Sequence, residues 1–216
     1  MLSLAVYLEI ICFVIALVCL RKIKEDAWRG MIIYLFATCV AELTGHFLKV
    51  AHHKNAWVYN ILLIAEAFFN SVLFGSILKQ YLKARPLIIG GLVLTFVAYI
   101  FELISHGIFI FNDLTVIVMS VIFVVYSLYY YFLLINDEQY IDLKRHASFW
   151  WVTGSLFYYF GGIASYLFYK FLAHINLGGH NIMFTISFAL SLLLYSCWIY
   201  AFICKRWLQP NSETGY

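Results

Sequence analysis

The chain has 216 residues, of which 64% are hydrophobic and 12% charged, and its mean hydropathy is +0.88. A soluble domain is about half apolar and about one quarter charged, and a chain of this length has too small an interior to bury so much apolar surface. The composition therefore excludes a water-soluble protein. The net charge of +3, with basic residues in short clusters, gives no support to nucleic-acid binding.

Seven apolar stretches follow one another along the chain, at about 2–20, 30–50, 57–79, 86–106, 113–135, 147–172 and 181–204. A helix of about 20 residues crosses the hydrocarbon core of a bilayer. Helices are expected, because lipid cannot satisfy an open strand edge and the short alternating segments of a β-barrel are absent. The sequence predicts an all-α fold, with residues 1–216 forming a single transmembrane domain of seven helices.

The basic residues indicate the orientation of these helices. Eleven of the 14 Lys and Arg residues lie in the first, third and fifth connections and in the tail, and only Lys49, Lys54 and Lys170 lie on the other side. Cytoplasmic loops carry an excess of Lys and Arg. We therefore expect a multi-pass protein of the cell inner (plasma) membrane, with its N-terminus outside and its C-terminus in the cytoplasm.

Tryptophans fit the same orientation. Trp28, Trp150, Trp151 and Trp207 fall near the expected inner interface and Trp57 near the outer one. Trp is enriched at both interfaces of a membrane, so we interpret these residues as aromatic belts.

A weak internal repeat appears at an offset of 121 residues. Segments 47–61 and 168–182 share six identical pairs, which are Phe47/Phe168, Lys49/Lys170, His53/His174, Asn55/Asn176, Asn60/Asn181 and Ile61/Ile182. A parallel duplication would give a 3+1+3 plan, with repeat units at about 1–80 and 113–204, as in some small transporters. The alternative is that both segments share the chemistry of a membrane interface, with snorkelling lysines and helix-capping asparagines.

Ionisable residues inside the apolar stretches are costly and mark candidate sites. Four carboxylates qualify: those of Glu9, Glu42 and Glu66 fall near the membrane middle, at about 1.5 Å per helical residue, and that of Glu102 lies closer to the outer surface. His46 shares a helix face with Glu42, whereas Tyr59 and Asn70 share one with Glu66. We expect a ligand- or ion-coupling site formed by Glu9, Glu42, His46, Tyr59, Glu66 and Asn70. The alternative is that protonated glutamates join helices by hydrogen bonds.

Polar stripes also occur on the sixth and seventh stretches. Their members are Ser155, Tyr158, Gly162 and Ser165 on the sixth, and Asn181, Thr185, Phe188 and Ser191 on the seventh. At the offset of 121, Glu66 corresponds to Ser187 and Asn70 to Ser191, so the acidic half is the first one.

The expected outer side is rich in histidine and other polar residues. We assign Lys49, His53, Asn60, Lys170, His174 and Asn181 to an outer vestibule. His46, His53 and His174 are candidate ligands of a metal ion entering from outside. The alternative, which we favour, is that the histidines bind lipid headgroups.

Resemblances can be tested on particular residues. The stretch 41–69, with Glu42, Gly45, Asn55, Trp57, Tyr59 and Asn60, resembles small bacterial seven-helix integral membrane proteins of no established activity. The outside-N, 3+1+3 layout is similar to that of SWEET and PQ-loop transporters, but the Pro-Gln pairs of those families are missing. The last stretch contains no lysine for a retinal Schiff base, so we expect no retinal cofactor.

The leading hypothesis is a small-solute or proton- or ion-coupled transporter, or a solute-binding bundle, that takes a small molecule or ion from outside. One alternative is a seven-helix sensor that signals to a separate cytoplasmic partner. A less favoured alternative is an intramembrane metalloenzyme, since no nucleophile–base constellation is visible. We therefore expect no enzyme activity, and the sequence specifies no oligomeric state.

Overall fold

A computed structural model describes residues 4–81, 83–137, 142–168, 176–177 and 180–208 of the chain. The described residues form seven α-helices: α1 (Leu4–Leu20), α2 (Asp26–Val50), α3 (Ala56–Leu78), α4 (Arg85–His106), α5 (Asp113–Ile135), α6 (Ala147–Leu167) and α8 (Ile182–Ile203). A 3₁₀ helix, η1 (Leu143–Arg145), precedes α6, and a π-helix, η2 (Cys204–Leu208), extends α8. Strands β1 (Asn176–Leu177) and β2 (His180–Asn181) pair antiparallel before α8.

The expected all-helical architecture is confirmed, with small differences in helix bounds. Helix α2 begins at Asp26, four residues before the expected start, because its polar first turn lowers the local hydropathy without breaking the helix. Helix α6 ends at Leu167 rather than at 172, and residues 169–172 of the expected stretch lie outside the described residues. Helix α5 has the expected bounds of 113–135.

Five of the described helices are long and apolar enough to cross a membrane: α2, α3, α4, α5, and α8 together with η2. Helix α1 is apolar but has only 17 residues. Helix α6 has 21 residues, and its Trp, Tyr, Ser and Gly side chains make it less apolar than its neighbours. These apolar helices are consistent with an integral membrane protein.

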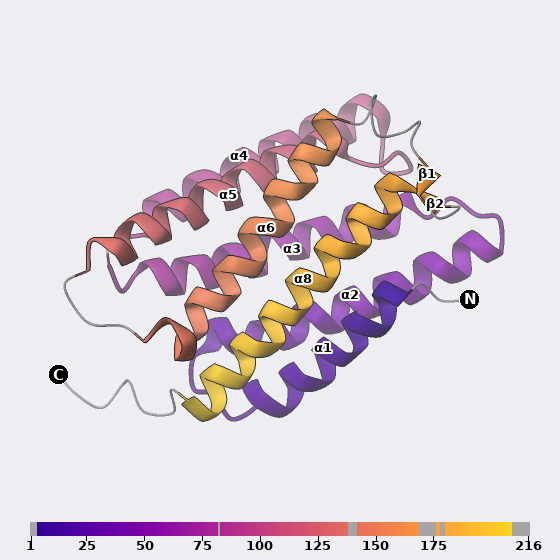
Figure 1. Ribbon diagram of the computed structural model, residues 1–216. Coiled ribbons are helices and arrows are strands. Elements are labelled where there is room, and N and C mark those ends of the chain that lie inside the picture. The colour runs from indigo at the N-terminus through magenta and orange to yellow at the C-terminus, as the bar shows by residue number, and fades with distance from the viewer. Residues whose placement is uncertain (1–3, 82, 138–141, 169–175, 178–179, 209–216) are drawn as a thin grey trace.

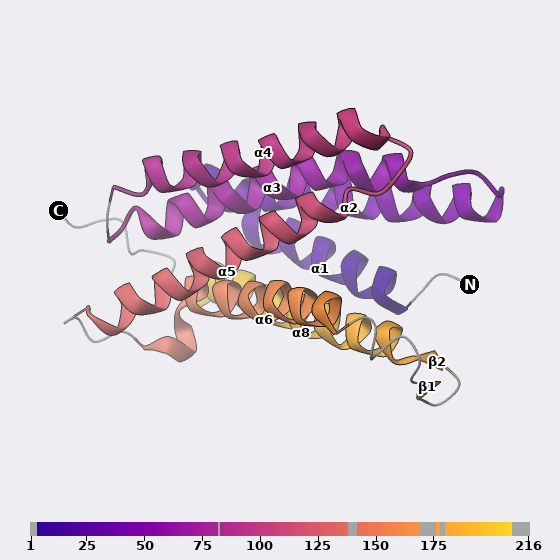
Figure 2. The ribbon, with the colours of Figure 1, turned by 90° about the horizontal axis from the view of Figure 1, so that it is seen from above.

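The helices run side by side along the long axis of the molecule, as Figure 1 shows. Six of them form a ring, in which α1 packs on α2, α2 on α3, α3 on α5, α5 on α6, α6 on α8, and α8 on α1. Helix α4 packs only against α3 and α5 among the principal helix contacts, so it lies outside the ring (Figure 2). We call the end at which α1 begins the N-terminal end of the bundle, and the end at which α8 finishes the C-terminal end.

The α4–α5 connection at the N-terminal end is fixed by two polar side chains. Asn60 donates from Nδ2 to the carbonyl oxygens of Ile108 and Ile110 at 2.9 and 2.8 Å, and its Oδ1 accepts from the Asn112 amide. The Glu102 carboxylate accepts from the amides of Leu114 and Thr115 at 2.9 and 2.8 Å. A carboxylate is favourable at a helix N-terminus, so Glu102 anchors the first turn of α5.

Buried aromatic side chains fill the ring toward its C-terminal end. Phe74 contacts Phe123 and Trp151, with ring centroids 5.6 and 4.8 Å apart, and Trp151 stacks on Trp198 at 5.7 Å. We call Phe74, Phe123, Trp151 and Trp198 the aromatic plug.

The structure corrects the interpretation of two tryptophans as belt residues. Trp151 is 0% exposed and Trp28 is 2% exposed, so both belong to the core. Both indole rings pack against other aromatic rings, and this packing buries their large apolar area. Trp207, in contrast, is exposed.

Candidate functional site

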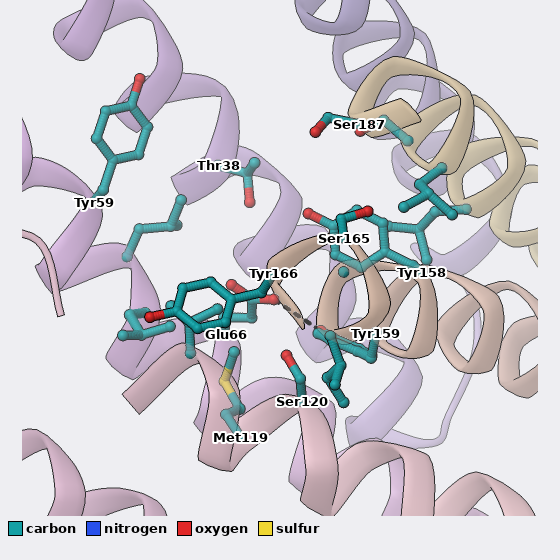
Figure 3. A pocket seen from close by; sticks show the side chains of 18 of the residues that line it. Thr38, Tyr59, Glu66, Met119, Ser120, Tyr158, Tyr159, Ser165, Tyr166 and Ser187 are labelled. Carbon is teal, nitrogen blue, oxygen red and sulfur yellow. Dashed lines mark hydrogen bonds between the residues drawn. The ribbon is translucent and has the colours of Figure 1, made fainter. Parts of the chain in front are cut away.

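A cavity of about 430 Å³ lies inside the ring, on the N-terminal side of the aromatic plug (Figure 3). Side chains from all six ring helices line it, and no α4 residue is among those that the structure describes on its wall. At its rim, Phe111, Asp113 and Tyr166 are exposed, whereas Met119 and Tyr195 are buried at its inner end. The cavity therefore opens toward the N-terminal end and is closed toward the C-terminal end.

Four carboxyl groups line this cavity: Asp113 at its rim, and three glutamates on three neighbouring helices. Glu9 lies on α1, Glu42 on α2 and Glu66 on α3. Glu66 is near the middle of its helix, which spans 56–78, so its side chain lies far from either end of the bundle. The structure thus brings together three of the four carboxylates that hydropathy marked as costly, and the fourth, Glu102, binds the first turn of α5 instead.

Each of the three glutamates accepts a hydrogen bond from a tyrosine. The Tyr159 hydroxyl donates to Oε1 of Glu66 at 2.8 Å, and the Tyr195 hydroxyl donates to Oε1 of Glu9 at 3.0 Å. The Tyr59 hydroxyl lies 3.4 Å from Oε2 of Glu42. The three hydrogen bonds differ in length, but in each of them a neutral hydroxyl group donates to an acid. The shared pattern is a carboxyl group whose polar partner carries no charge.

Asn70 extends one of the pairs into the protein. Its Nδ2 donates to the Tyr159 hydroxyl at 3.0 Å, so Asn70, Tyr159 and Glu66 form a chain of hydrogen bonds. Asn70 is fully buried and is not part of the cavity wall. It therefore contacts the tyrosine that binds Glu66 and does not itself face the cavity.

The opposite wall is built from hydroxyl and aromatic side chains of the second half of the chain. The hydroxyl groups come from Ser120, Ser165, Ser187 and Ser191, and the rings come from Tyr158, Tyr159, Tyr166 and Tyr195. Figure 3 shows Ser165, Ser187 and Tyr158 on the side of the cavity away from Thr38 and Tyr59. Below its rim, where Asp113 of α5 lies, the cavity thus has an acidic wall, from α1 to α3, and a hydroxyl-rich wall, from α5, α6 and α8.

Several lining residues were not among the candidates drawn from the sequence. Tyr34 and Thr38 stand at intervals of four before Glu42, and Ser187 and Tyr195 stand at intervals of four around Ser191. Spacing by four keeps residues on one face of a helix, so this periodicity could have indicated them. Of the sixth-stretch stripe, Ser155 does not reach the cavity, because its hydroxyl accepts from Nε1 of Trp198.

Other candidates lie away from the cavity. His46 is half-buried beside the ring of Phe47, and Lys49 and His53 are exposed at the N-terminal end. Asn60 is fully buried and holds the α4–α5 connection. These four residues are not on the described cavity wall.

The remaining three candidates belong to the α6–α8 connection. Lys170 and His174 lie outside the described residues. Asn181 lies in β2, paired with Asn176, and its side chain is likewise not described.

Among the described residues, those that line the cavity include no Lys, Arg or His. Ion pairs among the described residues include Arg29–Asp26, His106–Glu102, Arg145–Asp142 and Lys205–Glu25. The described residues contain no group of three His, Cys, Asp or Glu side chains close enough to hold one metal ion. The polar character of the wall therefore comes from acids and hydroxyl groups.

His146 is a titratable residue at the C-terminal end of the bundle, outside the helices. His146 precedes α6, and its Nδ1 accepts from the Phe149 amide at 3.3 Å, which caps that helix. Burial lowers the pKa of His146 from its ordinary value of 6.5, and the nearby positive charge of Lys205 lowers it further. The neutral ring is therefore the form that the fold favours.

Comparison of the chain with protein-family models, with curated proteins and with solved structures gave no match.

Proposed function

We propose that this chain is a seven-helix protein of the plasma membrane that binds a small solute in the cavity from outside and carries it across the membrane with a proton or cation. The observation that carries the proposal is the convergence of Glu9, Glu42 and Glu66 on one cavity in the middle of an apolar bundle. Ionisable groups at such depth are costly and mark ion or substrate pathways.

The orientation follows from charge. Basic residues gather at the C-terminal end, in the α1–α2, α3–α4 and α5–α6 connections and after α8. The excess of positive charge on cytoplasmic loops supports a cytoplasmic C-terminal end and a cavity that opens to the outside. Helices α1 and α6 complete the seven crossings in this proposal.

The cavity wall also supports the proposed repeat. At the offset of 121 residues, four pairs of positions line the cavity on both sides: Thr38/Tyr159, Glu42/Ile163, Leu62/Met183 and Glu66/Ser187. Helices α1–α3 and α5–α8 would be the two units, and α4, outside the ring, would be their linker. Parallel repeats with a central site are known among small transporters, so the arrangement favours transport.

Glu66 is the proposed coupling residue. Of the three glutamates, it lies farthest from the N-terminal end of the bundle, near the middle of α3. Its partner Tyr159 also contacts Phe123 of the aromatic plug, with ring centroids 4.9 Å apart. A change of charge on Glu66 would therefore act directly on a contact of the plug. Such a link between a carboxyl group and the closed end is what alternating access requires.

Transport can be tested in liposomes that contain the purified protein and an internal pH dye. Pools of small solutes are added outside, and we expect at least one pool to drive proton movement. Glu66→Gln should reduce this movement to the level of empty liposomes, because the glutamine cannot release a proton. Tyr159→Phe should weaken it, because the hydrogen bond to Glu66 is lost.

Glu25→Gln is the matched control, since Glu25 pairs with Lys205 at the C-terminal end and is far from the cavity wall. It should transport like the native protein. Undiminished flux in Glu66→Gln would contradict the role of Glu66. Saturable binding of a solute with no flux in any pool would contradict transport and favour the sensor.

A further inference from the structure

We propose that the ligand of the cavity is a small organic cation, an amine or a quaternary ammonium ion, whose charge rests on the acidic wall. This inference rests on the proposed function, because it names the class of solute that the same cavity takes. Three features of the wall carry it: its acids, its aromatic rings and its size.

The acids come first. Glu9, Glu42 and Glu66 face one space, and the polar partner that each of them has is a neutral tyrosine hydroxyl. A buried Oε2 atom of Glu9 has no hydrogen-bond partner, although Glu9 is only 8% exposed and lines the cavity. Buried carboxylates are stable when they are paired with a positive charge. A cation in the cavity would supply the charge that the wall itself does not.

The aromatic rings give a second reason. Tyr34, Tyr158, Tyr159 and Tyr195 line the inner part of the cavity, opposite or beside the acids. The face of an aromatic ring attracts a cation, and aromatic cages of this kind recognise quaternary ammonium groups. An anionic solute would meet the same faces and the same carboxylates unfavourably. The wall is thus suited to positive charge from both kinds of side chain.

Size and apolar surface select an organic ion. The cavity of about 430 Å³ falls within the range of small-molecule sites and, at about 30 Å³ for each water molecule, has room for roughly 14 water-sized groups. Its wall also includes Leu63, Val116, Ile117, Met119 and Leu194. Methyl and methylene groups of an organic cation would bury favourably against these side chains, whereas a hydrated metal ion would gain nothing from them.

The test compares cations with neutral molecules of the same shape. Purified full-length protein in lipid nanodiscs is titrated, at pH 7.5, with choline, tetramethylammonium, phenethylamine and putrescine. Each is matched with its neutral isostere, for example 3,3-dimethylbutan-1-ol for choline. Binding is measured by calorimetry and by the shift in thermal unfolding. We expect at least one cation to bind saturably, and its neutral isostere to bind at least about tenfold more weakly.

Variants locate the bound charge. Glu42→Gln and Glu9→Gln should each weaken binding of that cation by roughly tenfold or more, because each removes a charge-assisted contact. Glu25→Gln, away from the cavity, should bind normally. Tyr158→Phe should keep binding and Tyr158→Leu should lose it, since the proposed attraction comes from the aromatic ring, which phenylalanine keeps and leucine lacks. Circular dichroism and size-exclusion chromatography check that each variant is folded. If a glutamate variant does not fold, the comparison of Tyr158→Phe with Tyr158→Leu tests the inference in its place.

The outcomes separate this inference from the proposed function. Absence of binding by every cation of the panel would overturn the inference, as would equal binding of cation and isostere. Binding of a cation without flux would leave the inference standing and overturn transport. Flux of an anionic or neutral solute, with no cation bound, would overturn the inference and leave transport standing.

Discussion

At the scale of single residues, the cavity uses tyrosine as the partner of each of its three glutamates. A lysine or arginine in the place of Tyr59, Tyr159 or Tyr195 would have formed an internal ion pair and removed the negative charge from the site. A tyrosine hydroxyl donates one hydrogen bond and carries no charge, so the acid stays available to a proton or to a cation. A neutral partner is therefore compatible with the coupling role proposed for the acid.

His146 gives a prediction at the same scale, at the cytoplasmic end of the proposed topology. Its pKa is lowered in the folded protein, so the unfolded chain binds a proton at a higher pH than the folded chain does. The contribution of the neutral His146 ring to stability is therefore fully present above pH 6.5, the ordinary pKa of the group, and is lost as the pH falls below that value. We expect the thermal unfolding midpoint to decrease between pH 7 and pH 5.

His146→Asn is the matched variant for this prediction. An asparagine can cap α6 through the Phe149 amide but does not titrate. Its midpoint should decrease less over the same pH range. An equal decrease in both proteins would show that other groups cause the pH dependence.

The acids of the site could be predicted from sequence, as could Tyr59, the partner of Glu42, but the other two partners could not. Glu9, Glu42 and Glu66 interrupt apolar stretches, and hydropathy alone reveals them. Their partners depend on which helices meet: Tyr159 and Glu66 are 93 residues apart, and Tyr195 and Glu9 are 186 apart. Similarly, Asn60 carried the polarity of a vestibule residue, and only packing shows that it holds the α4–α5 connection.

At the scale of helices, two adjacent glycines of α4 differ in what surrounds them. A Cβ atom on Gly91 would lie 1.9 Å from the hydroxyl oxygen of Tyr126 and 2.9 Å from Cγ2 of Ile122. Tyr126 is 2% exposed, and its hydroxyl donates to the carbonyl of Leu87, so its ring has little room to move. A Cβ atom on Gly90 would meet nothing within 4 Å. Gly91 is thus the position at which α4 and α5 approach closely.

This difference predicts opposite outcomes for two similar substitutions. Gly91→Ala should destabilise the protein by about 1–3 kcal/mol, because the methyl group forces Tyr126 out of its place. Gly90→Ala should be neutral or slightly stabilising, because alanine favours a helix by up to about 1 kcal/mol over glycine. Denaturation in mixed micelles measures both. Equal stability of the two variants would contradict the close packing of α4 on α5.

The helices themselves were predictable because their apolar length is a property of sequence alone. The bounds differed where a boundary carries polar residues that a helix tolerates, as at Asp26 and Arg29 in the first turn of α2. The membrane-belt interpretation of Trp28 and Trp151 was wrong because hydropathy gives depth along a helix and not the direction of a side chain. Direction is fixed by neighbouring helices, and these are set by the whole bundle.

At the scale of the whole molecule, the two ends of the bundle differ in structure and in charge. The cavity opens at one end, and the aromatic plug and most of the Lys and Arg residues lie toward the other. If the C-terminal end is cytoplasmic, a solute can reach the acidic wall only from outside while the plug is closed. Orientation thus decides which solutes the site meets.

Cysteine labelling tests this orientation in intact cells. The five native cysteines are free; Cys12, Cys19, Cys39 and Cys204 are buried and Cys197 is half-buried, so the native protein should react little with a membrane-impermeant maleimide. His53 is exposed in the α2–α3 connection, and Leu143 is 41% exposed in η1 at the opposite end. We expect His53→Cys to be labelled in intact cells, and Leu143→Cys only after the cells are opened, because cytoplasmic loops are the ones rich in Lys and Arg. The reverse pattern would invert the topology and place the mouth of the cavity in the cytoplasm. Labelling of both sites in intact cells would mean that the two ends do not lie on opposite sides of the membrane.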